Sequence, residues 1–99
     1  MLGLAMRAGK VAVGTDAVID TLRQKKNKKA RVVLISNTAS DSTRSKIVYK
    51  CEYYRVSPII VDISASELGE ILGKLYAPSA VAITDDSFAA EIVRIISEG

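Results

Sequence analysis

Histidine and tryptophan are absent from this chain of 99 residues, and only one cysteine is present. Without histidine, the chain lacks the commonest general base and the commonest zinc ligand, so no metal or cofactor is expected. Cys51 has no second cysteine for an internal disulfide and no imidazole that would activate its thiol. Because unpaired cysteine is typical of reducing compartments, we expect a cytoplasmic protein in which Cys51 is a buried packing residue on an apolar helical stripe.

Long apolar runs and the common phosphate-binding motifs are also missing. No run approaches the ~20 residues of a transmembrane helix, and the start MLGLAMRAGK lacks the basic region of a signal peptide. Neither GxxxxGKS/T nor GxGxxG occurs. Asp85 and Asp86 follow a predicted strand and are the one candidate metal site, but carboxylates also suit the start of a helix, which is the interpretation we favour. We therefore expect neither a membrane protein nor an enzyme.

Charge is distributed unevenly along the chain, although the net charge is only +3. Residues 1–55 carry 12 Lys/Arg and 4 Asp/Glu, a balance of +8, whereas residues 56–99 carry 2 and 7, a balance of −5. In a compact fold this asymmetry gives one face a positive potential that attracts polyanions. A solubilising charge pattern with no partner is the alternative, and charge alone does not separate the two.

Short runs rich in β-branched residues predict strands at residues 31–36, 58–63 and 80–84, and Val11–Val13 is a shorter candidate. The longer runs show no clean polar and apolar alternation, which indicates strands covered on both faces. With helices between them, the strands predict right-handed crossovers and an α/β fold, a three-layer α/β/α sandwich with a mixed, mostly parallel four-stranded sheet. The length is that of one domain, so residues 1–99 are expected to form a single domain.

Apolar residues at helical spacing predict helices between these strands. The predicted helices cover residues 1–8, 15–26, 41–54, 65–75 and 87–97. The helix at 65–75 has the clearest start, because Ser64 followed by Glu67 forms a capping box that satisfies free amides in both directions.

Two segments of the N-terminal half suit anionic partners. In AGKVAVGTDAV, Lys10 precedes the short strand and Gly14-Thr15 opens a helix, whose start offers free amides and a partial positive charge. A tight strand-to-helix turn is the alternative. The stretch RQKKNKKAR packs six Lys/Arg into nine residues at 23–31, where it is either a solvated loop or a contact to RNA phosphates that reads no sequence.

Two further segments carry side chains suited to bases. In SNTASDSTRSK, Asn37 directly follows a strand, and its amide pairs with base edges and suits a turn equally well. Arg44 and Lys46 lie a short distance further along the chain, close enough to reach a backbone. In LGKLYAPSAVAIT, Lys74, Leu75 and Tyr76 precede the last strand. Leu75 and Tyr76 are either the edge of the core or a stacking platform for an unpaired base.

Together, GLAMRAGKVAVGTDAV, LISNTASDSTRSKI, CEYYRV, ELGEILGK and GKLYAPSAVAITD resemble the ribosomal protein L7Ae/L30e family, above all its bacterial, YlxQ-like branch. The similarity covers nearly the whole chain in order, and AGKxxxG, the asparagine after the strand and LGxxxGK are its most specific parts. It implies a three-layer α/β/α fold and noncatalytic recognition of kink-turns, in which a bulge and tandem G·A pairs bend two RNA helices sharply. A ribosome-associated, monomeric protein that binds structured RNA, ribosomal RNA included, is therefore expected.

The resemblance also implies which residues contact RNA. The helix start at 14–17 enters the opened major groove, Asn37 matches the asparagine of the eukaryotic ribosomal member, and the loop at 74–76 covers an extruded base, with Tyr76 stacked on it. Many relatives carry Asn or Lys in place of Asp16, Glu or Gln in place of Ala17, and Lys in place of Asp20. Carboxylates near a phosphate path reduce counterion release, so a restricted subset of bent RNAs is expected.

Two other classes of function remain open from the sequence. A protein-interaction module would use the helix faces that carry Tyr49 and Tyr53. A small metal-dependent enzyme would use Asp85 and Asp86, and a specific divalent-metal site would distinguish it from an RNA-binding protein.

Overall fold

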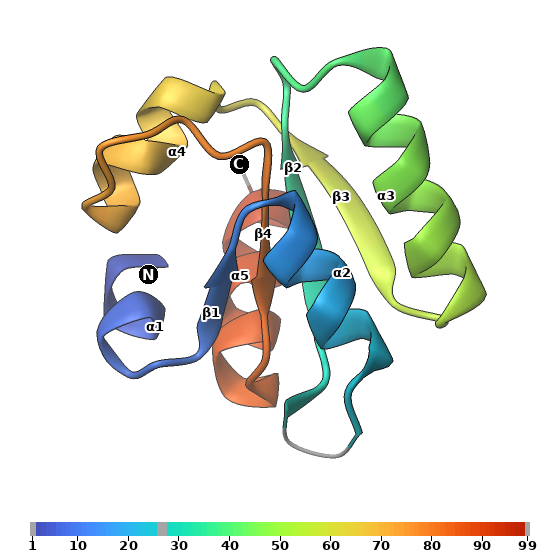
Figure 1. Ribbon diagram of the computed structural model, residues 1–99. Coiled ribbons are helices and arrows are strands. Elements are labelled where there is room, and N and C mark those ends of the chain that lie inside the picture. Colours follow the sequence, from blue (N-terminus) through green and yellow to red (C-terminus); the bar gives the residue numbers. More distant parts are fainter. Residues whose placement is uncertain (1, 26–27, 99) are drawn as a thin grey trace.

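The computed structural model describes residues 2–25 and 28–98, and in this part of the chain five helices surround a four-stranded sheet. The elements in chain order are α1 (Leu2–Arg7), β1 (Val11–Val13), α2 (Thr15–Arg23), β2 (Val32–Ser36), α3 (Asp41–Tyr53), β3 (Ser57–Val61), α4 (Ala65–Leu72), β4 (Ala80–Ile83) and α5 (Asp86–Glu98). The sheet has the strand order β1-β4-β2-β3. Helices cover both of its faces, so the predicted α/β/α sandwich is confirmed (Figure 1).

The sheet is mixed, as predicted, but the expectation that it is mostly parallel is wrong. Only β2 and β3 pair in parallel, whereas β4 is antiparallel to both of its neighbours, β1 and β2. The reason lies in the connection after β3. Helix α4 is short, and the segment after it brings the chain back to the end of the sheet that β3 has just left, where Ala80 pairs with Ile35. Strand β4 must therefore run in the opposite direction.

Each predicted helix and strand is present, and the differences lie at their ends. The helix predicted at 15–26 ends at Arg23, because Gln24 is extended; Lys26 lies outside the described residues. The helix predicted at 65–75 ends at Leu72, where Gly73 adopts a left-handed conformation with φ 70°. The strand predicted at 58–63 is shifted by one or two residues, to Ser57–Val61.

Side chains cap the last two helices at their starts. The Ser64 hydroxyl accepts a hydrogen bond from the Glu67 amide at 3.1 Å and donates to the Glu67 carboxylate at 3.2 Å. The predicted cap is confirmed, although the return bond runs to the Ser64 hydroxyl and not to its amide. Asp85 accepts a hydrogen bond from the Phe88 amide at 3.0 Å, so it caps α5, as the favoured interpretation predicted.

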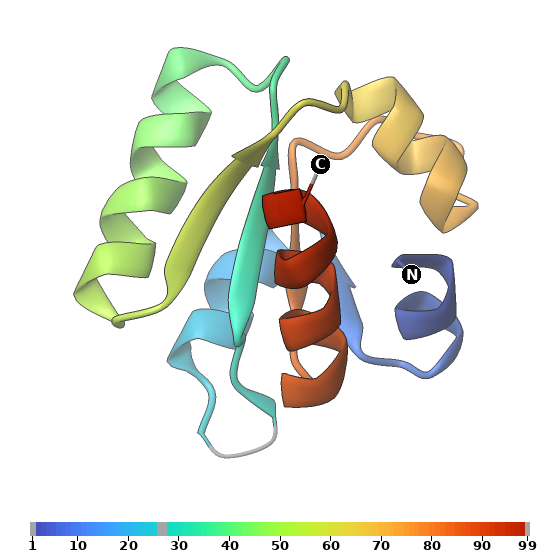
Figure 2. The same ribbon diagram turned by 180° about the vertical axis from the view of Figure 1, so that it is seen from behind.

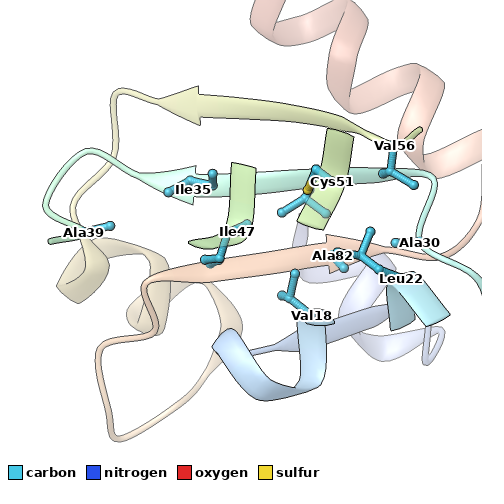
Figure 3. Close-up of a cluster of buried hydrophobic side chains, with 11 residues drawn as sticks. Val18, Leu22, Ala30, Ile35, Ala39, Ile47, Cys51, Val56 and Ala82 are labelled. Carbon is cyan, nitrogen blue, oxygen red and sulfur yellow. The ribbon is translucent and has the colours of Figure 1, made fainter. Parts of the chain in front are cut away.

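The core is divided by the sheet into two apolar layers. On one face, α2 and α3 pack on β2 and β4 through Leu22, Ile35, Ile47 and Cys51, which Figure 3 shows together. On the other face, α1, α4 and α5 pack on the same strands (Figure 2). All residues of β2 and β4 are buried, which explains their continuous apolar runs.

Candidate functional site

Three connections between elements meet at one end of the sheet, at the top of Figure 1. They are the starts of α2, of α3 and of β4, and the antiparallel course of β4 brings them together. The Gly14 amide donates to the Ala80 carbonyl at 2.9 Å, and the Ser36 amide donates to the Ser79 carbonyl at 2.8 Å. We call this region, residues 14–17, 37–40 and 74–79, the upper end.

The start of α2 lies at the centre of the upper end. Gly14 has φ 99°, a conformation that favours glycine, and no side chain caps the helix. The first amides of an α-helix have no partner within the helix, so those of residues 15–17 remain available to a ligand. The Asp16 side chain is exposed beside them, while Thr15 and Ala17 are half-buried.

Asn37 is held beside a carboxylate that the sequence did not single out. Its amide nitrogen Nδ2 donates to Asp62 Oδ1 at 2.9 Å, and its backbone amide donates to the Ile63 carbonyl at 3.0 Å. The side-chain contact orients the amide and leaves the Asn37 Oδ1 atom as an acceptor. The signal for Asp62 is the parallel pairing of Ser36 with Val61, since residues that follow paired parallel strands lie side by side.

The loop after α4 carries Leu75 and Tyr76 into solvent. Leu75 is fully exposed and Tyr76 is 56% exposed, so neither belongs to the core edge. Lys74 is half-buried, and its amide donates to the Gly69 carbonyl at 2.8 Å. With the bond from the Gly73 amide to the Glu70 carbonyl, this is a Schellman ending, which fixes the direction in which the loop leaves the helix.

Gly69 is a second residue that the sequence analysis missed. A Cβ atom on this buried glycine would lie 2.3 Å from the Tyr76 carbonyl oxygen and 3.3 Å from Pro78 Cδ. Only glycine therefore allows the loop backbone to pack this closely on α4. The LGxxxGK motif indicates that a glycine is present here, but only the fold shows what approaches it.

Two of the expected site residues, Arg44 and Lys10, lie outside the upper end. Arg44 lies in α3 close to the upper end, where its guanidinium forms an ion pair with Asp41. Lys10 lies at the opposite end of β1 from Gly14, where its carbonyl accepts a hydrogen bond from the Thr84 amide at 2.9 Å. The structure thus brings Arg44 toward the other predicted residues but keeps Lys10 apart from them.

The basic stretch predicted at 23–31 also lies away from the upper end. The Ala30 amide donates to the Thr21 carbonyl at 3.2 Å and the Arg31 amide to the Ile83 carbonyl at 2.7 Å, which places the stretch beside the end of β4. We call this region, residues 9–10, 23–25 and 28–31, the lower end; it is at the bottom of Figure 1. Lys26 and Asn27 of the predicted stretch lie outside the described residues.

The lower end uses some of its cations for internal contacts. Lys29 Nζ donates to the Tyr54 carbonyl at 3.2 Å and lies 5.9 Å from the centre of the Tyr54 ring. Arg31 forms an ion pair with Asp86 at 3.2 Å. The side chains of Arg23, Lys25 and Lys28 are exposed.

The described residues offer little for nucleophilic or metal chemistry. Within residues 2–25 and 28–98, no three His, Cys, Asp or Glu side chains gather as metal ligands. The two candidate ligands are engaged elsewhere, Asp85 as a helix cap and Asp86 with Arg31. Cys51 is fully buried, and burial, followed by the charge of Glu52, raises the pKa of its thiol to about 11. It therefore remains a protonated packing residue at neutral pH, as predicted.

None of the helices that the structure describes has the length and hydropathy needed to cross a bilayer.

Comparison with known proteins finds the same similarity along the chain. The model of the ribosomal protein L7Ae/L30e/S12e/Gadd45 family matches residues 1–93. The RNA-binding protein YlxQ of Bacillus subtilis is 41% identical over 96 residues, which cover 97% of this chain and 91% of that protein. The large ribosomal subunit protein eL30 of Tetrahymena thermophila is 34% identical over 84 residues, 85% of this chain and 78% of that protein.

A solved structure agrees with the fold. A protein of unknown function from Bacillus halodurans C superimposes with a TM-score of 0.84 and 26% sequence identity, covering 97% of this chain and 92% of that one. These matches confirm the resemblance seen in the sequence, including its YlxQ-like character.

Proposed function

Because the chain belongs to the ribosomal protein L7Ae/L30e/S12e/Gadd45 family, we propose that it is a noncatalytic RNA-binding protein that recognises kink-turns or similarly bent structured RNA. The name of the relative in Bacillus subtilis, RNA-binding protein YlxQ, supports the RNA-binding part of this proposal. The family name and the similarity to eL30 support an association with the ribosome. We propose a cytoplasmic, monomeric protein of one domain, with no cofactor.

The observation that carries the proposal is the convergence, at the upper end, of three different elements suited to RNA. The uncapped start of α2 offers amides to phosphates or base edges, Asn37 offers an oriented amide, and Tyr76 offers an exposed aromatic face. A straight duplex keeps its bases stacked and its deep major groove closed to side chains. The combination therefore suits RNA in which a bend opens the groove and extrudes a base.

The proposed mechanism is a shift of population. Kink-turn RNA interconverts between an extended and a bent form, and a protein that binds the bent form more tightly increases its share. Helix α2 would enter the groove, while the loop at 74–79 would cover the extruded base. Packing of this loop on Gly69 reduces the ordering that binding would otherwise require.

The charges of the upper end favour a restricted range of RNA partners. Asp16 and Asp20 are both exposed on α2, and the Arg44 cation is paired with Asp41. Few cations are therefore left there to neutralise phosphates, and selectivity rests on amides and stacking. We propose that binding at the upper end depends on the shape of the RNA more than on its charge.

A gel-shift experiment tests this proposal. A standard kink-turn is compared with the same RNA duplex without its bulge and G·A pairs, at 50 mM and 200 mM salt. We expect tighter binding of the kink-turn at both concentrations, with a preference that persists at 200 mM because it depends on shape. Equal affinity for the two RNAs at 200 mM salt, or no binding of either at 50 mM, would overturn the proposal.

A protein-interaction module is the second candidate, because Tyr49 and Tyr53 on α3 are 65% and 69% exposed. Aromatic residues are enriched in protein interfaces. A stoichiometric partner protein that stays bound after nuclease treatment, and is lost in a Tyr49→Ala/Tyr53→Ala variant, would favour this function. Retention of that partner by the variant would argue against it.

A further inference from the structure

We propose that the lower end is a second binding site, which holds backbone phosphates of a nucleic-acid duplex independently of the upper end. The site consists of Lys10 and Lys28 beside a small hollow, with Lys25 nearby. It goes beyond the proposed recognition of bent RNA, and neither site requires the other.

The hollow lies where the α1–β1 connection meets the basic stretch. It has a volume of about 360 Å³, and its polar side chains are those of Lys10, Lys28, Thr21 and Thr84. Among the residues that the structure describes, no acidic side chain lines it. The two lysines are far apart in sequence and are brought together by the backbone bond between Thr84 and Lys10 and by the bond between Ala30 and Thr21. Ammonium and hydroxyl donors around an acid-free hollow suit a phosphate group.

The lysines of this site have no acidic partner in the part of the chain that the structure describes. No carboxylate of the described residues lies within 4.0 Å of the charged groups of Lys10, Lys25 or Lys28, whereas Arg44 and Arg94 both have acidic partners. Lys29 and Arg31 of the same stretch make contacts that hold the loop on α3 and α5. Within the stretch, Lys29 and Arg31 therefore hold the loop in place, whereas Lys25 and Lys28 are available to a ligand.

The distance between the two ends requires separate phosphate groups. Strand β4 runs from the upper end to the lower end, from Ala80 to Ile83, with Ser79 and Thr84 beyond it. Six residues in extended conformation span about 17 Å, because a strand rises about 3.3 Å per residue. One phosphate cannot contact both ends. The phosphates at the lower end must therefore come from a different nucleic-acid segment than the one that fills the upper end.

The donors of the lower end favour a nucleic-acid backbone that is bound without sequence preference. Lysine is a flexible point charge and lacks the rigid fork with which arginine reads guanine. Several lysines on one surface release counterions when they meet a regular array of phosphates, and the gain grows with each phosphate neutralised. A single free phosphate would use only the hollow, and Lys25 would then contribute nothing.

The test uses an RNA duplex of 16 base pairs without a bulge, together with the variant Lys10→Ala/Lys28→Ala. We expect its affinity for the duplex to fall by roughly tenfold at 50 mM salt, and the slope of log K against log salt to decrease by about 2, one for each cation removed. The matched control is Lys46→Ala/Lys50→Ala, which removes the same charge from α3. Both lysines line another hollow, together with Asp16, Asp20 and Arg23. This control should retain the affinity of the unchanged protein within about twofold.

A second arm tests the independence of the two ends. Kink-turn RNA is immobilised, saturated with protein and then exposed to the labelled duplex. We expect the duplex to be captured by the unchanged protein and lost with the Lys10→Ala/Lys28→Ala variant, while Lys10→Arg/Lys28→Arg restores capture. For the Tyr76→Ala protein, duplex affinity measured in solution should be unchanged.

Several outcomes of these experiments would overturn the proposal of a second site. Equal losses in the variant and the charge-matched control would show that only net charge matters. Loss of kink-turn binding together with duplex binding in the variant would show that a single RNA occupies both ends. Displacement of the duplex by inorganic phosphate at equal phosphate concentration, or binding of phosphatidylserine vesicles in place of the duplex, would assign the site to another ligand. If only the kink-turn preference fails, duplex binding at the lower end still stands.

Discussion

The upper and lower ends of the sheet differ in the kind of groups that they present. The upper end offers a helix start, an oriented amide and an exposed tyrosine. Lys74 is the only Lys or Arg among residues 14–17, 37–40 and 74–79, and the nearby Arg44 is already paired with Asp41. The lower end offers lysines without a carboxylate partner among the described residues. One end is suited to the shape of a ligand and the other to its charge.

This difference shows why net charge is a poor guide to the position of a binding site. The excess of Lys/Arg in residues 1–55 suggests one positive face. The fold instead places the basic stretch at the lower end, and places Asn37, Tyr76 and the start of α2 at the upper end. Charge sets long-range attraction and salt dependence, whereas selectivity depends on hydrogen-bond geometry and stacking.

The change with the largest expected effect is Gly69→Ala, which would break the upper end alone. The added methyl group would lie 2.3 Å from the Tyr76 carbonyl oxygen, so the loop must move. We expect a loss of about 1–3 kcal/mol in the free energy of unfolding from overpacking, together with weaker binding of the kink-turn. Urea denaturation and gel shifts measure the two effects.

The matched control for Gly69→Ala is Gly3→Ala in α1. The nearest atom to a Cβ on Gly3 is the Ile71 carbonyl oxygen at 4.0 Å, so alanine fits and increases helix propensity. This variant should be at least as stable as the unchanged protein and bind RNA equally well. Duplex binding at the lower end should survive in both variants. If Gly69→Ala leaves kink-turn affinity unchanged, the loop at 74–79 does not contact the RNA.

Tyr76→Ala is expected to have the next largest effect, and it separates stacking from loop position. Loss of base stacking should weaken kink-turn binding by about 1–3 kcal/mol, while stability changes little because the side chain is 56% exposed. Tyr49→Ala removes a tyrosine of similar exposure from α3 and should leave RNA affinity unchanged. Isothermal titration with kink-turn RNA measures the affinities of the unchanged protein, Tyr76→Ala and Tyr49→Ala. Wild-type affinity in Tyr76→Ala would show that no base stacks on this ring.

Loss of Tyr76 and displacement of its loop should not be additive. If Gly69 acts on RNA binding only through the position of this loop, the double variant Gly69→Ala/Tyr76→Ala should bind no more weakly than the weaker of the two single variants. Additive losses would show that Gly69 affects a different part of the upper end.

The smallest effect is expected from Cys51→Ala, which changes the core between the two ends and neither end itself. Burial raises the pKa of the thiol from its ordinary 9.0 to about 11. Between these values the unfolded chain loses a proton that the folded chain keeps, so the free energy of unfolding falls as pH rises from about 9 to about 11. Cys51→Ala should lose about 1 kcal/mol at neutral pH from the deleted side chain, and its stability should fall less over that pH window.

Unfolding curves from pH 8 to pH 11 measure this difference, and subtraction of the two proteins removes the titration of lysines and tyrosines that they share. Both proteins should bind the kink-turn and the duplex equally well at neutral pH. Parallel curves would contradict the raised pKa of Cys51, and a selective loss at one end would show that the core does not support both ends alike.

The local features of the fold were predictable from the sequence, but their mutual arrangement was only partly so. The continuous apolar runs of β2 and β4 and the caps at Ser64 and Asp85 reflect neighbours in the chain, and they were predicted correctly. The direction of β4 was not, because it depends on where the short helix α4 ends. The left-handed Gly73 shows that end, whereas the helical spacing of apolar residues continues to Leu75.

The candidate site shows the same division. Asn37 and Tyr76 were found from their positions after a strand and in a loop, and from a family resemblance. Asp62 and Gly69 were not found, because each acts through a residue that is distant in sequence or folded back on it. Lys10 was grouped with Gly14 on the basis of proximity in the chain, but the strand between them holds the two residues at opposite ends of the sheet.

By itself, the sequence determined which segments form helices and strands, that the single cysteine is buried, and which family the chain belongs to. These properties depend on the period of apolar residues, on capping groups and on motifs in order along the chain. The tertiary structure alone decided that amides and an aromatic ring gather at one end of the sheet and available lysines at the other. Strand direction sets that arrangement, because it assigns each connection to one end, and no local pattern of residues specifies it.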